Sequence, residues 1–341
     1  MSKESAFEQF APAICRVYRR DKEAFWAAVM APFLENNMSL LAWLHHLPVD
    51  LRLLAAFRGL DDAAGQTLKA FGAPLGVDVT AWPSNRPQYF KDAYPIFAFL
   101  AVWMEEEQLE AFLARFGDIL RAGVFAVAGY GILDANVDSD QPSPVEILTA
   151  NALVAEYETL ALNIFGVSVV NLGILHRMRT LFLQAEIREK AARHQFSPYC
   201  WENPKELGAK GANAVTPYML SLERLGRTDQ IEDYWEVFLL FGAAIQMIDD
   251  WIDLEGDLAA GHYSYVTLGY EDLYRSRDAK TAAAMLRADQ KRLRDTYECS
   301  KEMIAEARSI LNRLGDKLLV RLVDVTELRV DSYFRKQLKV A

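Results

Sequence analysis

Four aspartates occur close together in one segment of the chain, GAAIQMIDDWIDLEGDLAAG, which runs from Gly242 to Gly261. They are Asp249, Asp250, Asp253 and Asp257. In an α-helix, Asp249, Asp253 and Asp257 fall near one face, each about 6 Å along the axis from the last. Carboxylates stacked in this way repel one another, and a bound cation would relieve that repulsion.

The residues before these aspartates indicate where the carboxylates lie. An apolar run, Val237 to Ile248, should lie in the core, so the first carboxylates are expected at the rim of a buried cavity. Like charges in a low-dielectric wall are costly unless a cation neutralises them. Oxygen ligands of this kind suit Mg²⁺, which commonly bridges one or two carboxylates to substrate phosphates. The alternative interpretation is a solvated, acidic helix end.

A second acidic cluster lies upstream in the segment YGILDANVDSDQPSP. It comprises Asp134, Asp138 and Asp140, and the first two are again four residues apart. Taken alone, such residues before a proline-rich turn are ordinary helix-ending and turn-forming residues. Both clusters, however, follow long apolar segments. If the two helices are neighbours in a bundle, the acidic sets face each other across a pocket mouth, as in metal sites of bundle cores.

The elements that carry these clusters are predicted to be helices. Apolar residues recur at three- and four-residue spacing through most of the sequence, and alternating β-branched runs are nearly absent. The predicted fold class is therefore all-α. The predicted helices cover residues 5–30, 38–59, 93–104, 106–134, 144–190, 206–225, 229–255, 278–313 and 315–338. The two longest should contain breaks that the sequence does not locate.

The acidic segments resemble motifs of the class I isoprenoid synthase superfamily, which contains trans-prenyltransferases, squalene-type synthases and terpene cyclases. Gln246, then Asp249-Asp250-Trp251-Ile252-Asp253, then Gly256-Asp257, is similar to the FQxxDDxxD…GD pattern of trans-prenyltransferases. Lys210-Gly211 resembles the family's KT element, with Gly in place of Thr. Asn85-Arg86-Pro87 resembles the end of its basic GKRxRP segment. The resemblance implies an all-α bundle around a single deep active-site cavity.

The resemblance also implies roles for individual residues. In the family, two acidic motifs hold a magnesium cluster that grips the diphosphate of an allylic substrate and draws it off, leaving a carbocation. The implied metal ligands are Asp134, Asp138, Asp249, Asp250, Asp253 and Asp257, and all of these except Asp257 are also the implied catalytic residues. The implied diphosphate-binding residues are Lys210, Gln246, Arg329 and Tyr333. Arg179 is a further candidate from a basic cluster on the helix that follows the first motif, which also contains Arg177, Arg188, Lys190 and Arg193. Arg329 and Tyr333, one helical turn apart, resemble the Arg-Tyr pair of class I cyclases.

Two departures from the family pattern bear on the reaction. The first acidic motif reads DxxxD, which is closer to squalene-type synthases than to elongating enzymes. No Lys or Arg occurs between Gln141 and His176, where chain-elongating relatives carry an arginine pair for isopentenyl diphosphate. We therefore favour a terpene synthase that cyclises or eliminates a single substrate. A prenyltransferase, either elongating or head-to-head, and a non-catalytic helical binding protein on the same fold stay open as alternatives.

The domain organisation is less well marked in the sequence. The stretch from 60 to 92 contains Ala73-Pro74, Trp82-Pro83 and Arg86-Pro87, which are typical of loops, and is the candidate linker, although it is too apolar for a free tether. We expect residues 1–80 to form an N-terminal helical section packed on the core. Residues 81–341 would form the class I isoprenoid synthase-like catalytic domain.

Composition excludes several other classes of protein. Of the 341 residues, 52% are hydrophobic and 25% charged, which is far from the composition of a disordered chain. The net charge of -10 argues against a nucleic-acid partner, because phosphate-backbone binders need a basic face. The three cysteines, at positions 15, 200 and 299, have neither metal-site nor disulfide spacing.

The expected location is the cytoplasm. The N-terminal residues carry acids and lack the apolar stretch of a secretory signal. The longest apolar stretch, Leu160 to Leu175, is interrupted by Asn163 and Asn171 and is shorter than the roughly 20 residues that a bilayer helix needs. No transmembrane segment is therefore expected. The prenyl diphosphate substrate would be the partner, and a homodimer is possible because members of the family often form one.

Overall fold

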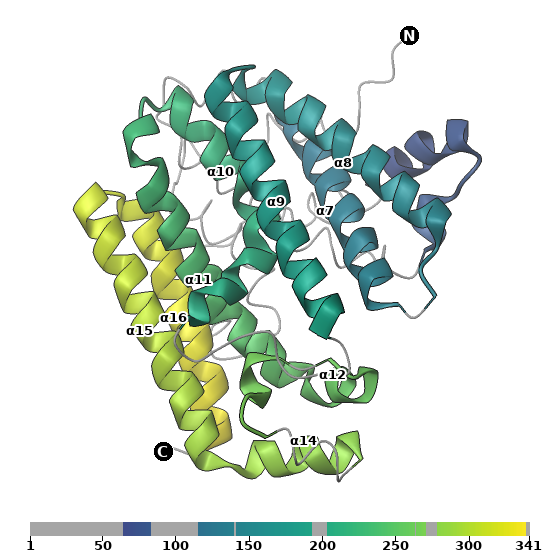
Figure 1. Cartoon of the computed structure of the whole chain (residues 1–341). Coiled ribbons are helices and arrows are strands. Elements are labelled where there is room, and N and C mark those ends of the chain that lie inside the picture. Colours follow the sequence, from purple (N-terminus) through teal and green to yellow (C-terminus); the bar gives the residue numbers. More distant parts are fainter. Residues whose placement is uncertain are drawn as a thin grey trace, which may run out of the picture. The chain divides into compact units, whose positions relative to one another are not determined.

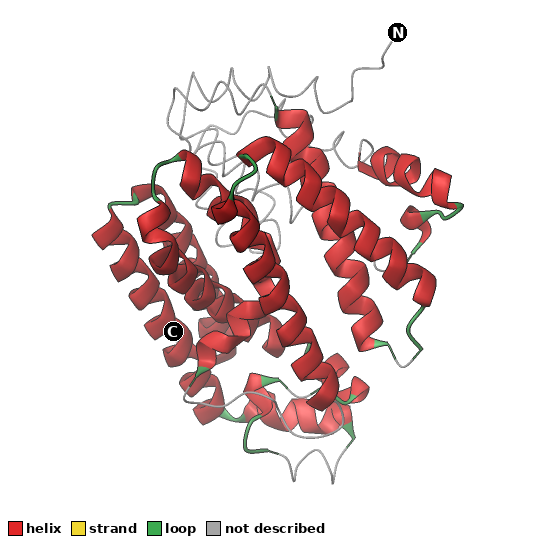
Figure 2. Ribbon diagram, turned by 45° about the horizontal axis from the view of Figure 1, so that its top comes forward, coloured by secondary structure: helices red, strands yellow, loops and turns green. Residues whose placement is uncertain are grey.

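The computed structural model describes residues 64–82, 115–139, 141–192, 203–262, 264–270 and 278–338. The chain forms two units, the first of Met1–Leu175 with Leu220–Gly226, the second of His176–Met219 with Arg227–Ala341. Every regular element in the described ranges is a helix (Figure 1, Figure 2), which confirms the all-α prediction for that part of the chain. None of these helices combines the length and apolar character needed to cross a bilayer.

In the first unit, α7 (Phe116–Asp138) packs along α8 (Pro144–Phe165). Gly129 allows the close approach, because a Cβ there would lie 2.8 Å from Val154 Cγ2. Tyr130 packs edge-on against Tyr157 across the same contact, with ring centroids 6.5 Å apart. The contact between the two helices thus fixes the end of α7, which carries the first acidic cluster.

A short helix over residues 64–72 lies in the stretch interpreted as a linker, and η2 (Ala73–Leu75) and η3 (Val79–Ala81) follow it. Its buried side chains include Ala64 and Leu68. Phe71 packs against Phe125 of α7, with ring centroids 5.4 Å apart. The linker interpretation is wrong for these residues, because their apolar face belongs to the core of the first unit.

The predicted helix over residues 144–190 is two helices, α8 and α9 (Val169–Ala192). The break lies at Gly166, whose φ of 107° is one that L side chains rarely adopt. Its backbone N–H donates to Leu162 O and closes the last turn of α8. The chain passes from the first unit into the second within α9, after Leu175.

In the second unit, α11 (Ile231–Ile252) is the central helix. It contacts η4 (Pro204–Gly211), α15 (Gln290–Leu314) and α16 (Lys317–Leu338). Its largest fully buried side chains are Tyr234, Trp235 and Trp251. Burial of each such side chain contributes a few kcal/mol, on the order of 2 to 3, so α11 is a firm support for the acidic residues at its end.

Shorter elements complete the second unit. α12 (Leu254–Ala260) follows α11 and contacts α14 (Ala279–Ala288), while η5 (Thr228–Gln230) precedes α11 and η6 (Tyr265–Thr267) packs on it. The predicted helix over residues 206–225 begins as the 3₁₀ helix η4 and continues as α10 (Ala212–Arg224).

The predicted helix over residues 278–313 is also two helices, α14 and α15. Asp289 separates them, because its carboxylate accepts hydrogen bonds from the backbone N–H groups of Lys291 and Arg292, each at 3.0 Å. A side chain that caps a helix in this way starts a new helix instead of continuing the old one.

Asp316 holds the start of α16 on α11. This buried carboxylate accepts hydrogen bonds from Tyr234 Oη at 2.9 Å, from Arg227 at 3.2 Å and from the backbone N–H of Leu319 at 3.0 Å. Three donors satisfy the buried charge, so the contact is stable in the interior. It sets the position of α16, which carries Arg329.

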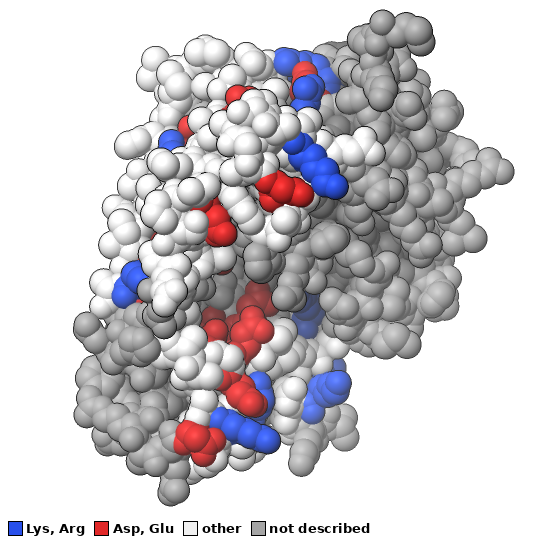
Figure 3. All heavy atoms as spheres, turned by 90° about the vertical axis from the view of Figure 1, so that its right-hand side faces the viewer, with Lys and Arg blue, Asp and Glu red and all other residues white. Residues whose placement is uncertain are grey.

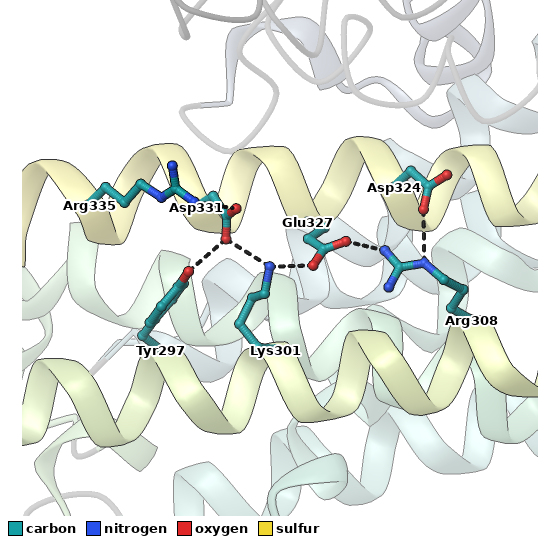
Figure 4. Close-up of polar contacts among 7 residues, drawn as sticks. All are labelled: Tyr297, Lys301, Arg308, Asp324, Glu327, Asp331 and Arg335. Atoms are coloured by element: carbon teal, nitrogen blue, oxygen red, sulfur yellow. Dashed lines mark hydrogen bonds and ion pairs between the residues drawn. The ribbon is translucent and has the colours of Figure 1, made fainter. Parts of the chain in front are cut away.

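α15 and α16 lie side by side and are joined by a row of polar contacts (Figure 4). Lys301 contacts Glu327 and, at 2.9 Å, Asp331. Arg308 contacts Glu327 and, at 2.9 Å, Asp324. Because each basic side chain serves two acids, the row forms a network along the two helices.

Candidate functional site

The second acidic segment spans the end of α11 and the whole of α12. Asp249 and Asp250 belong to the last turn of α11, Asp253 lies at the junction, and Asp257 lies in α12. The predicted helix was expected to run to residue 255, but α11 ends at Ile252, and Asp253 separates it from α12. The backbone N–H of Asp253 still donates to Asp249 O at 2.9 Å, and that of Asp257 to Asp253 O at 3.0 Å. The predicted one-turn spacing of these three aspartates is therefore present.

Asp250 is the buried member of the segment, with 5% of its surface exposed. Gln246, one turn earlier, donates from Nε2 to Asp250 Oδ1 at 3.0 Å. Asp250 Oδ2 is buried and accepts no hydrogen bond from the residues that the structure describes. Loss of hydration raises the pKa of Asp250 to about 7, against the lowering effects of Gln246 and Lys210. A carboxylate in this state gains much from a cation at its free oxygen.

Lys210 is brought to this segment by a contact between two glycines. Gly208 on η4 packs on α11, where a Cβ would lie only 2.0 Å from Leu239 O. Gly242 of α11 completes the contact, since its own Cβ would lie 3.2 Å from Gly208 Cα. Gly242 is one turn before Gln246 and two before Asp250, so η4 crosses α11 on the face that carries Asp250. The ammonium group of Lys210 lowers the pKa of Asp250, which places it within electrostatic reach.

Glu189 on α9 is a member of the site that the sequence did not predict. Its Oε2 accepts a hydrogen bond from Lys210 Nζ at 2.6 Å, and its charge raises the pKa of Asp250. Sequence inspection singled out only the basic residues of this helix. One of them, Arg188, pairs with Glu206 of η4 at 2.5 Å. Together the two acid-base pairs join α9 to η4, and no sequence motif marks Glu189.

Arg329 of α16, which follows the acidic segment in the sequence, contacts one of its aspartates. Its Nη2 lies 3.4 Å from Asp249 Oδ1, and both side chains are partly exposed. Tyr333 lies one turn further along α16, and burial raises the pKa of its hydroxyl to about 12, so it stays protonated as a donor at neutral pH. Arg179, also predicted to bind diphosphate, lies on α9 and is partly exposed.

The first acidic cluster belongs to the first unit. Asp134 is partly exposed near the end of α7, and Asp138 is the last residue of that helix. Asn136, between them, donates to Glu146 Oε2 at 2.9 Å and accepts from the backbone N–H of Ser143 at 2.7 Å, which fixes the turn into α8. The prediction that this cluster faces the second one stays a prediction. Asp140, Asn85-Arg86-Pro87 and the predicted helices 5–30, 38–59 and 93–104 lie outside the described residues.

The donor set fits Mg²⁺ in its chemistry. Among the described residues, no three His, Cys, Asp or Glu side chains are grouped closely enough to hold a metal ion by themselves. Mg²⁺, however, commonly takes only one or two carboxylates and completes its shell with water and substrate phosphate. The free Oδ2 of Asp250 is suited to such a site. Figure 3 shows the Asp and Glu side chains (red) and the Lys and Arg side chains (blue) of the described residues on one face of the molecule.

No protein-family model matches this chain, and no curated protein matches it significantly. The function is therefore inferred from the site residues and from the motif resemblance.

Proposed function

We propose that this chain is a Mg²⁺-dependent class I terpene synthase, which ionises a linear allylic prenyl diphosphate and releases pyrophosphate. The observation that carries the proposal is the buried carboxylate of Asp250, which lies within electrostatic reach of Lys210 and has one oxygen that accepts no hydrogen bond from the described residues. A carboxylate and an ammonium group in one site suit a ligand that combines a divalent cation with an anion.

The residues of the second unit would divide the work as follows. Gln246 holds Oδ1 of Asp250, so that Oδ2 is the oxygen left for a cation. Lys210 would donate to the diphosphate. Arg329, already 3.4 Å from Asp249, would add positive charge at the edge of the acidic segment. These donors are held by helix packing, which fits electrostatic stabilisation of a charge that grows during reaction.

In the proposed reaction, the allylic C–O bond breaks and its electron pair leaves with the diphosphate. Bound Mg²⁺ would supply Lewis-acid stabilisation of the charge on the departing group. The resulting carbocation, either directly or after cyclising, loses a proton to the released pyrophosphate or to water and becomes a neutral hydrocarbon. No covalent bond to the protein is needed.

One feature favours cyclisation or elimination over chain elongation. α8, which follows the first acidic cluster, carries three glutamates, Glu146, Glu156 and Glu158, and no Lys or Arg. An elongating enzyme must also hold a second anionic substrate, isopentenyl diphosphate. A helix without basic residues gives that substrate no anchor. A prenyltransferase that binds it elsewhere is the second candidate.

The test is an assay of pyrophosphate release and of extractable hydrocarbons, with geranyl, farnesyl and geranylgeranyl diphosphate in the presence of Mg²⁺. Each reaction is run with and without isopentenyl diphosphate. The proposal expects a cyclic or rearranged product from one substrate alone. Turnover only with the second substrate would identify a prenyltransferase. No turnover with any of them would contradict both enzymes and leave the non-catalytic binding protein.

A further inference from the structure

The contact between Glu189 and Lys210 joins α9 to η4 next to the acidic segment. Lys210 Nζ lies 2.6 Å from Glu189 Oε2, and the two side chains are 24% and 25% exposed. An ion pair that is three-quarters withdrawn from water is stronger than an exposed pair, because solvent screens it less. The lysine predicted to bind diphosphate is therefore engaged by a carboxylate of the protein itself.

Several charged side chains surround the contact between Glu189 and Lys210, and they affect how an anion can bind there. Lys210, Glu189 and Asp257 all act on the pKa of Asp250, so one ammonium and three carboxylates share a small region. A diphosphate that entered without a cation would have to compete with Glu189 for Lys210. It would also approach the carboxylates of Asp250 and Asp257. Both effects oppose binding of the anion alone, and a divalent cation among the carboxylates removes both.

We propose that Glu189 is a positioning residue that makes diphosphate binding depend on a divalent cation. It holds Lys210 while the cation is absent, and it yields the lysine to the diphosphate once a cation neutralises the acidic segment. This inference rests on the diphosphate site of the proposed function, and it adds the order in which that site fills. Pyrophosphate and substrate without bound metal would thereby be kept out of the diphosphate site.

The test is calorimetric titration of the full chain with inorganic pyrophosphate, with and without Mg²⁺. Glu189→Gln keeps the shape of the side chain and removes its charge. Glu206→Gln is the matched control, because Glu206 pairs with Arg188 at 2.5 Å between the same two elements and is similarly exposed. Lys210→Met provides a second, independent variant.

The expected result is that Mg²⁺ strengthens pyrophosphate binding to the wild-type chain. Glu189→Gln should bind metal-free pyrophosphate about fivefold more tightly than the wild type and gain correspondingly less from Mg²⁺, as expected when one nearby charge is removed. Glu206→Gln should match the wild type. Lys210→Met should weaken binding with Mg²⁺ but leave metal-free binding within about twofold, because Glu189 already holds the ammonium there.

The outcomes separate the two proposals. Unchanged or weaker metal-free binding in Glu189→Gln would overturn the role of Glu189 while leaving the diphosphate site intact. Equal loss of metal-free and Mg²⁺-dependent pyrophosphate binding in Lys210→Met would also overturn the role of Glu189. If the wild-type chain binds no pyrophosphate in either condition, the diphosphate site is absent, and the proposed function fails with it.

Discussion

Gly208 and Gly242 pack directly against each other, so that η4 and α11 cross with no side chain between them. A Cβ on Gly208 would lie 2.0 Å from Leu239 O, and one on Gly242 would lie 3.2 Å from Gly208 Cα. The crossing brings Lys210, two residues after Gly208, to the face of α11 that carries Asp250. Two residues without chemistry of their own thus determine where the charged groups of the site meet.

Replacing Gly208 should separate η4 from α11. We expect Gly208→Ala to lower the free energy of unfolding by about 2 to 4 kcal/mol, because backbone atoms cannot move away cheaply from an added methyl group. Gly211→Ala is the matched control in the same 3₁₀ helix, where a Cβ meets nothing within 4 Å. Its effect should stay within about 0.5 kcal/mol. Urea unfolding measures both, and equal effects would contradict the crossing.

The buried Asp250 should make stability depend on pH. Its pKa is raised from 3.8 to about 7, so the folded protein retains a proton that the unfolded chain has released between those values. The free energy of unfolding therefore falls as pH rises through this window and stays low above it. Asp250→Asn should remove this component and raise the Tm at pH 8 by about 5 °C relative to the wild type.

The measurement is Tm against pH for both proteins without Mg²⁺, with Asp295→Asn, an exposed position on α15, as the control. Mg²⁺ with pyrophosphate should raise the wild-type Tm at pH 8, since a ligand that binds only the folded state stabilises it. Parallel pH profiles for the wild type and Asp250→Asn would show that Asp250 is not the buried titrating group.

The row of contacts between α15 and α16 (Figure 4) should stabilise the second unit in a salt-dependent way. Lys301→Met leaves Glu327 and Asp331 without their shared cation, and we expect a loss of about 1 to 2 kcal/mol. Arg313→Met, which removes an exposed pair with Asp233, should cost less than about 0.5 kcal/mol. Urea unfolding at low and at high NaCl tests this, and the difference between the variants should shrink with salt.

A role of the first acidic cluster in cation binding can be tested by mutation, whatever its position relative to the second cluster. If Asp134 takes part in cation binding, Asp134→Asn should lower kcat/KM by about a hundredfold or more and raise the Mg²⁺ concentration needed for half-maximal rate. Glu156→Gln, an exposed carboxylate on α8, should change neither value by more than about twofold. An active Asp134→Asn variant with unaltered Mg²⁺ dependence would restrict the site to the second cluster.

The sequence predicted the all-α class that the described residues show, because apolar spacing reflects which face of each helix is buried. It did not locate the breaks at Gly166 and Asp289, since the first depends on a backbone angle and the second on a carboxylate that caps a helix. The helix over residues 64–72 was missed for a related reason. The prolines that follow it are typical of loops, whereas the burial of Leu68 depends on packing that the sequence does not reveal.

The candidate site also combines residues predicted from the sequence with a contact that only the structure reveals. Asp249, Asp250 and Lys210 were predicted as site residues from their match to motif patterns, whereas the burial of Asp250 is visible only in the structure. Glu189 was missed because it belongs to no motif. It joins Lys210 only through the way α9 and η4 come together. A residue such as Glu189, which positions another side chain and belongs to no motif, can be recognised only from the three-dimensional structure.

The central claim is that the acidic segment at the end of α11 supports metal-dependent ionisation of a prenyl diphosphate. Its most direct test is Mg²⁺-dependent pyrophosphate release by the wild type, Asp249→Ala and the control Asp295→Ala, with the best allylic substrate from the panel above. The account predicts turnover by the wild type and the control, and a loss of at least about a hundredfold in Asp249→Ala. Equal rates in all three proteins, or release without Mg²⁺, would contradict it.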